Sequence, residues 1–150
     1  MRRFQFSLEA LLQVKQHQLD VLQAEIAELE RRQNDRRVLL TRLGEELENT
    51  AQSRMTSILA GIDADSLQEY FHRWVYLFEC IQRLDREIHD SDIFLESRRD
   101  DYRILYREHQ MLEEMKSRAR QQWWETVLKE EQKTLDEFGT LRFVRNTGSF

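Results

Sequence analysis

Few residues in this chain could perform acid–base, nucleophilic or metal chemistry, and none has the spacing that such chemistry needs. The histidines are His17, His72, His89 and His109, and no two stand four residues apart with an acidic partner, as a zinc-binding HExxH helix requires. Cys80 is the only cysteine, so it lacks a second thiol at ligand spacing. Glycine-rich phosphate loops and GxSxG turns are absent. We therefore predict a protein that is not an enzyme and holds no metal or cofactor.

The elements that carry these residues are expected to be two long helices. The longer one should cover about 66–138, because this stretch has no Pro and no Gly before Gly139. Apolar residues recur along it about every 3.5 positions, which is the heptad spacing of a left-handed coiled coil. The stripe consists of Leu67, Tyr70, Trp74, Leu77, Ile81, Leu84, Ile88, Ser91, Leu95, Arg98, Tyr102, Leu105, His109, Leu112, Lys116, Ala119 and Trp123. Such a stripe needs a partner helix.

The first helix is expected over about 7–52, with Ser7 as its N-cap. Its stripe has the same heptad spacing. Three members, Lys15, Gln33 and Arg36, are polar, and we interpret them as residues that fix the register or extend to water. The stripe consists of Leu8, Leu12, Lys15, Leu19, Leu22, Ile26, Leu29, Gln33, Arg36, Leu40, Leu43 and Leu47.

Between the two stripes the heptad pattern lapses, which predicts a turn over about 53–65 with Gly61 in the loop. Ser66 and Glu69 have the spacing of a capping box at the start of the second helix. Two heptad helices around one turn predict an all-α fold, a long antiparallel two-helix coiled-coil hairpin in a single domain, 1–150.

Pairing outward from a turn near residue 59 would place Leu12 near Tyr106. It would leave roughly twenty residues of the second helix beyond the amino terminus, a length of about 30 Å. After Gly139 we expect a flexible tail over 139–150.

Composition narrows the functional classes. Charged residues form 34% of the chain and the formal net charge is −5, so the clustered excess of Lys and Arg that nucleic-acid binding needs is missing. The single Cys80 suits a reducing compartment. The sequence has no apolar run of the ~20 residues that a membrane span requires. We expect a soluble, cytoplasmic protein that binds no nucleic acid.

Two places have more apolar side chains than one seam can cover. The start of the second helix has the aromatic residues Tyr70, Phe71, Trp74 and Phe78, with mostly small or polar residues opposite. Either the turn residues Ile58, Leu59 and Ile62 cover these rings, or the rings bind a partner. The other place is the overhang, where the apolar residues could pair with a second copy or insert into a partner. This overhang includes Trp123, Trp124, Leu128 and Leu135.

Three segments resemble the FliJ proteins of bacterial flagellar type III export. The first has two aromatic residues, one position apart, followed by Leu-Leu and a basic residue. The second is the turn followed by Tyr70 and a run of apolar residues. The third has Leu-Asp-Glu near the end of the second helix. Written out, the first and third are Phe4-Gln5-Phe6-Ser7-Leu8-Glu9-Ala10-Leu11-Leu12-Gln13-Val14-Lys15 and Lys133-Thr134-Leu135-Asp136-Glu137-Phe138.

The resemblance implies a central stalk that inserts its helix ends into a hexameric export ATPase. It also implies a contact, early in the second helix, with the cytosolic domain of the large export-gate membrane protein. Some members also handle chaperones of export substrates. The chain would then lie peripherally at the cytoplasmic face of the inner membrane, through its partners only.

On this basis the ATPase-binding ends would be Phe4, Phe6, Leu8, Trp123, Trp124, Leu128 and Leu135, and the export-gate patch would be Tyr70, Phe71, Trp74 and Phe78. Two alternatives stay open, a generic coiled-coil scaffold that homodimerises and the equivalent stalk of a virulence-type injectisome.

Overall fold

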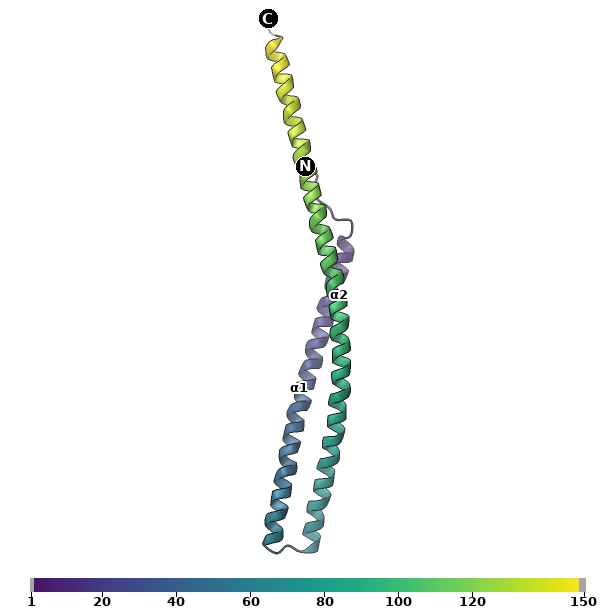
Figure 1. Cartoon of the computed structure of the whole chain (residues 1–150), viewed down its shortest axis with the longest axis vertical. Coiled ribbons are helices and arrows are strands. Elements are labelled where there is room, and N and C mark those ends of the chain that lie inside the picture. The colour runs from purple at the N-terminus through teal and green to yellow at the C-terminus, as the bar shows by residue number, and fades with distance from the viewer. Residues whose placement is uncertain (1, 149–150) are drawn as a thin grey trace. The chain divides into compact units, whose positions relative to one another are not determined.

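The computed structural model describes residues 2–148 and contains two helices joined by a short loop (Figure 1). Helix α1 spans Glu9–Leu59 and helix α2 spans Ala64–Thr147, and the described residues include no strand. The predicted hairpin of two long helices packed against each other is confirmed. The chain divides into two compact units, which are described separately. Unit 1 takes residues 1–19 and 104–150, and unit 2 takes residues 20–103.

The seam between the helices follows the heptad stripes. Every member of the predicted α1 stripe is buried or half-buried, and in the α2 stripe only Leu67 is exposed. Removing a Leu or Ile side chain from water stabilises the fold by about 1.5–3 kcal/mol. The apolar core of unit 1 consists of Leu12, Leu19 and Leu112, and that of unit 2 consists of Leu22, Leu77, Leu84, Ile88 and Leu95.

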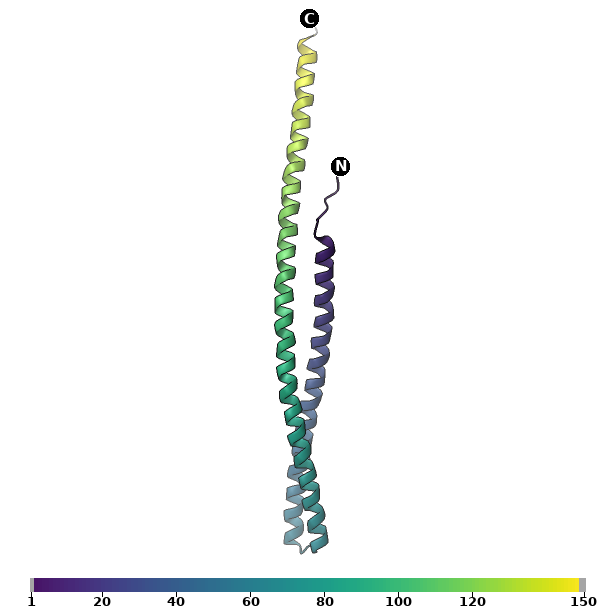
Figure 2. The same cartoon turned by 90° about the vertical axis from the view of Figure 1, so that its right-hand side faces the viewer.

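Within unit 2 the two helices run side by side and are connected by the loop (Figure 1 and Figure 2). The predicted turn over 53–65 is too long, because α1 continues to Leu59. No Gly or Pro interrupts the chain between Gly44 and Gly61, so the polar residues in this stretch do not end the helix. Gly61 lies in the loop as predicted, at a φ of 84° that suits glycine, and its N–H donates to the carbonyl of Ile58 at 3.2 Å.

Both predicted helix starts are wrong by about two residues. Helix α2 begins at Ala64, and the carboxylate of Asp63 accepts a hydrogen bond from the N–H of Ser66 at 3.3 Å. Asp63 is therefore the N-cap, and the hydrogen bonds from Ser66 lower the pKa of its carboxyl group. Helix α1 begins at Glu9, two residues after the predicted cap Ser7.

The carboxyl-terminal part of α2 also differs from the prediction. The helix continues through Gly139 to Thr147, so the prediction of a flexible tail is wrong for residues 139–147. One glycine costs a helix only about 1 kcal/mol, which does not stop a helix that has no proline. Residues 149–150 of the predicted tail lie outside the described residues. That the whole chain forms a single domain stays a prediction.

The pairing of the helices is shifted relative to the prediction. In unit 1 the Nζ atom of Lys15 lies 2.8 Å from a carboxylate oxygen of Glu108, and the same distance joins Lys116 to Glu9. Residue 12 is therefore opposite the segment near Leu112, and its predicted position near Tyr106 is wrong by about six residues, between one and two helical turns. The shift follows from the position of the loop, which is centred past residue 60 instead of near residue 59.

Candidate partner-binding surfaces

The aromatic patch of unit 2, defined as Tyr70, Phe71, Trp74 and Phe78, lies on the first turns of α2. The rings of Trp74 and Phe78 are stacked, with centroids 5.2 Å apart and planes at 9°. The hydroxyl of Tyr70 lies 3.3 Å from that of Ser57 on α1. Tyr70 and Trp74 are half-buried against the seam, whereas 52% of Phe71 and 41% of Phe78 remain exposed.

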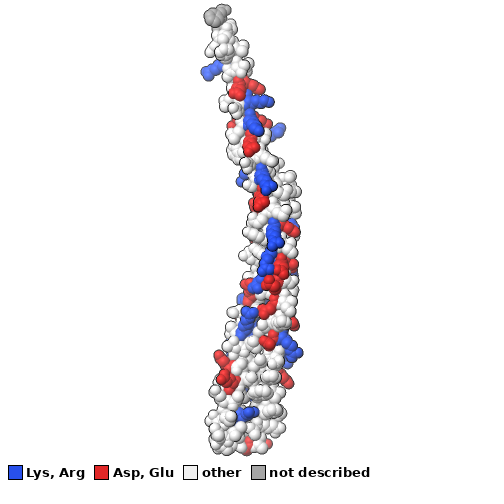
Figure 3. Space-filling model, in the orientation of Figure 1, with Lys and Arg blue, Asp and Glu red and all other residues white. Residues whose placement is uncertain are grey.

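The end of α1 does not cover this patch, because Leu59 is 82% exposed and Ile58 is 43% exposed. Ile62, in the loop, is half-buried. Tyr76, beside the patch, is also largely exposed. Toward the loop end of unit 2, the face shown in Figure 3 has few charged side chains. Exposed aromatic side chains that gather in this way are typical of a protein-binding surface.

The second surface is the carboxyl-terminal part of α2 in unit 1. Every residue from 128 to 148 is exposed, so no part of the described chain covers this segment. Figure 2 shows the amino-terminal part of α1 beside the green part of α2 and not beside its yellow end. This free segment, residues 128–147, has exposed apolar side chains at Leu128, Leu135, Phe138, Leu141, Phe143 and Val144. Trp124, which precedes it, is 52% exposed.

The amino-terminal segment before α1 is attached to α2. The ring of Phe4 packs against the indole of Trp123, and the guanidinium of Arg120 lies 5.5 Å from the centroid of Phe4. Trp123 is half-buried by this contact, so its predicted place in an unpaired overhang is wrong. Phe6 and Leu8 are half-buried in the same unit.

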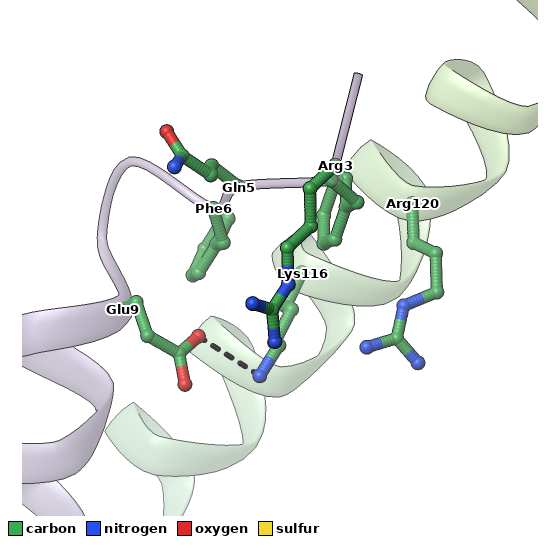
Figure 4. A pocket seen from close by; sticks show the side chains of 7 residues that line it. Arg3, Gln5, Phe6, Glu9, Lys116 and Arg120 are labelled. Carbon is green, nitrogen blue, oxygen red and sulfur yellow. Dashed lines mark ion pairs between the residues drawn. The ribbon is translucent and has the colours of Figure 1, made fainter. Parts of the chain in front are cut away.

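A hollow of about 470 Å³ lies beside this segment, in unit 1 (Figure 4). Its charged residues are Arg3, Glu9, Lys116 and Arg120, and Glu9 is paired with Lys116 at 2.8 Å. Periodicity could not find this hollow, because the segment that forms its wall is not helical. The one sequence signal is the pair of basic residues four positions apart on α2, which share a helix face.

A polar cluster interrupts the seam in the middle of unit 2. Gln33 is 3% exposed, and its Nε2 donates to the carbonyl of Ile88 at 2.9 Å and to the carboxylate of Asp92 at 2.6 Å. Arg36 donates to the hydroxyl of Ser91 at 2.5 Å. These bonds join specific positions of the two helices, as expected for polar seam residues that fix the register. Lys15, in unit 1, forms its ion pair at the rim of the seam.

The ion pairs along α1 and α2 are largely exposed and stabilise the fold only slightly. These pairs also shift pKa values. Hydrogen bonds from Arg31 and Arg32 lower the pKa of the Glu28 carboxyl from 4.5 to about 2. Its partner Arg31, and Arg99 beside Glu30, have a raised pKa for the corresponding reason.

The histidines of the described residues belong to no cluster of three potential metal ligands. His109 is buried in the seam as predicted, with Nε2 3.8 Å from a carboxylate oxygen of Glu113 and Nδ1 without a hydrogen-bond partner among residues 2–148. The same residues contain no cluster of three potential metal ligands. In neither α1 nor α2, over the described residues, is there a stretch apolar and long enough to cross a membrane.

One family model matches the chain. It is described as flagellar FliJ protein and covers residues 4–148, nearly the whole sequence. None of the curated proteins and none of the solved structures compared with the chain matches it.

Proposed function

The chain belongs to the FliJ family of flagellar export proteins, and from this premise we propose that it is a non-enzymatic central stalk and export chaperone of the flagellar type III apparatus. In this role its helix ends contact the hexameric export ATPase. Its aromatic patch contacts the cytosolic domain of the export gate, so that the protein acts at the cytoplasmic face of the inner membrane through its partners.

The observation that carries the ATPase contact is the exposed free segment of α2. A single helix about 10–12 Å across can enter the central pore of a ring, whereas a bundle needs a wider opening. Its side chains at Leu128 and Leu135 are 57% and 70% exposed among the described residues. Apolar contacts are not directional, so such a tip can hold a pore without fixing one orientation. Phe4, Phe6 and Leu8, the amino-terminal residues proposed to join this contact, are half-buried in unit 1.

Alanine substitution of the apolar face tests this contact. The variant Trp124→Ala, Leu128→Ala and Leu135→Ala keeps the helix but removes the exposed apolar side chains. The matched control is Gln122→Ala, Glu130→Ala and Lys133→Ala, which changes an exposed polar face and leaves the net charge unaltered. We expect the first variant to lose most of its stimulation of ATPase hexamer formation and ATP hydrolysis, while the control keeps it.

The same exposed residues could instead join two copies of the chain, which is the scaffold alternative. Analytical ultracentrifugation of the parent chain without ATPase separates the two readings. A monomer that stimulates the ATPase supports the stalk. The stalk would be excluded if the parent chain forms a stable dimer, the triple alanine substitution disrupts this dimer, and the substitution leaves ATPase stimulation unchanged.

The gate contact rests on the aromatic patch. Anchoring aromatic residues at interfaces often carry about 2 kcal/mol or more each. We expect the single variants Phe71→Ala and Trp74→Ala each to weaken binding of the gate's cytosolic domain by about thirtyfold. Phe94→Ala is the control, because Phe94 is 49% exposed in the same unit but away from the patch. Equal affinity of Trp74→Ala and the parent, at equal helix content, would rule out the patch.

A further inference from the structure

We propose that the hollow beside the amino-terminal segment of unit 1 binds an acidic segment of a protein partner, one that carries carboxylates next to an apolar side chain. Its walls are the non-helical segment before α1, the first residue of α1 and one face of α2. The inference goes beyond the proposed stalk role. It shares Phe4 and Phe6 with the proposed ATPase contact, but its test measures peptide binding in the absence of the ATPase. It is carried by charge and by the aromatic residues of the hollow.

The charge of the hollow is positive. Arg3, Lys116 and Arg120 line it with one carboxylate, Glu9, which is already paired with Lys116. Among residues 2–148, neither Arg3 nor Arg120 forms an ion pair. In Figure 4 the charged ends of Arg3, Lys116 and Arg120 lie on the same side of the amino-terminal segment. The hollow thus has a local excess of positive charge, although the formal net charge of the chain is −5.

Guanidinium groups favour carboxylates as ligands. Each presents a planar fork of N–H donors that matches the two oxygens of a carboxylate or the oxygens of a phosphate. Arg120 is held in place over the ring of Phe4, which reduces the entropy that it loses when it binds an anion. An adjoining hollow is lined by Glu113 together with Lys116 and Arg120, so the positive region is short. A short region suits a few side chains and not a nucleic-acid backbone.

The aromatic residues distinguish a peptide from a free anion. Phe4 and Phe6 line the hollow beside the arginines, and both are half-buried. An apolar side chain next to a carboxylate can cover these rings, whereas inorganic phosphate contacts the charges only. The volume of about 470 Å³ accommodates side chains of this size.

Calorimetric titration of the full chain with a short synthetic peptide that alternates Asp with Leu tests the inference. We expect saturable binding that weakens as salt is raised, and no binding of the matched peptide with Asn at each Asp position. Arg3→Gln and Arg120→Gln should each weaken binding about tenfold. Arg118→Gln, which removes the same charge from an exposed position outside the hollow, should leave it unchanged. Glu9→Gln, which removes the only carboxylate of the hollow, should strengthen it about threefold.

Other outcomes would overturn the inference. If Arg118→Gln weakens binding as much as Arg3→Gln does, the attraction is that of a general surface charge. If inorganic phosphate binds as tightly as the peptide and competes with it, the hollow is an anion site without preference for peptides. An absence of peptide binding at low salt also excludes it. Circular dichroism of each variant controls for helix loss, and Arg3→Gln, which leaves the contact between Arg120 and Phe4 intact, keeps the test valid if Arg120→Gln disturbs the segment.

Discussion

The ring of Phe4 lies against the indole of Trp123, with 5.9 Å between the ring centroids and 58° between their planes. This contact attaches the non-helical amino-terminal segment to α2 in unit 1. The same ring also carries the guanidinium of Arg120. Phe4 therefore has two roles in this unit. It lines the basic hollow, and it contacts α2 shortly before the free segment begins.

Replacing Phe4 tests this contact. We expect Phe4→Ala to lower the free energy of unfolding by about 1 kcal/mol, through loss of an aromatic pair. Amide hydrogens near the start of α1 should exchange faster, because the preceding segment is no longer held. Phe143→Ala, at a position 69% exposed, is the control and should change neither quantity. Unchanged exchange in Phe4→Ala would show that the segment is held by other contacts.

Gln33 is expected to fix the register of the two helices at a cost in the stability of the fold. Its side-chain oxygen is buried without a hydrogen-bond partner among residues 2–148, although its Nε2 has two. Replacing it with Leu removes this unsatisfied group and extends the apolar seam, so Gln33→Leu should raise the free energy of unfolding by about 1 kcal/mol. Urea denaturation followed by circular dichroism measures this. Gln18→Leu, at an exposed position of α1, is the control, and a loss of stability in Gln33→Leu would contradict the assignment.

The ion pairs of Glu28 predict a dependence on pH. Its pKa is lowered from 4.5 to about 2 in the folded chain, so its stabilising effect is complete above pH 4.5 and is lost as the pH falls toward 2. The difference in thermal midpoint between the parent and Glu28→Gln should therefore be small but measurable at pH 7, and strongly reduced near pH 2. High salt should reduce it at pH 7. Glu45→Gln, at an exposed position, is the control. A difference that is as large at pH 2 as at pH 7 would point to packing instead of charge.

The sequence predicts the seam well because burial follows a fixed period. Leu12, Leu19, Leu84 and Leu95 are all buried at stripe positions. It predicts the helix ends poorly, because polar residues such as Thr50 are tolerated inside a helix when packing supports it. Thr50 is buried in α1, and its hydroxyl bonds to the carbonyl of Glu46 at 2.8 Å.

The sequence likewise predicts some residues of the candidate surfaces and misses others. Leu128 and Leu135 are recognisable from the sequence as apolar residues without a partner, and the structure leaves them exposed. The contact of Phe4 with Trp123 and the placement of Arg3 beside Lys116 depend on the path of a non-helical segment, for which periodicity gives no information.

Photo-crosslinking from the free segment tests the stalk assignment most directly. A photoreactive amino acid at position 135, in the otherwise complete chain, is irradiated with the export ATPase under conditions in which it forms hexamers. We predict a covalent adduct between the chain and an ATPase subunit, and none when the photoreactive residue replaces Gln18, an exposed position of unit 1 on α1. Adducts between two copies of the chain, with no ATPase adduct from position 135, would contradict the stalk and favour a self-associating scaffold.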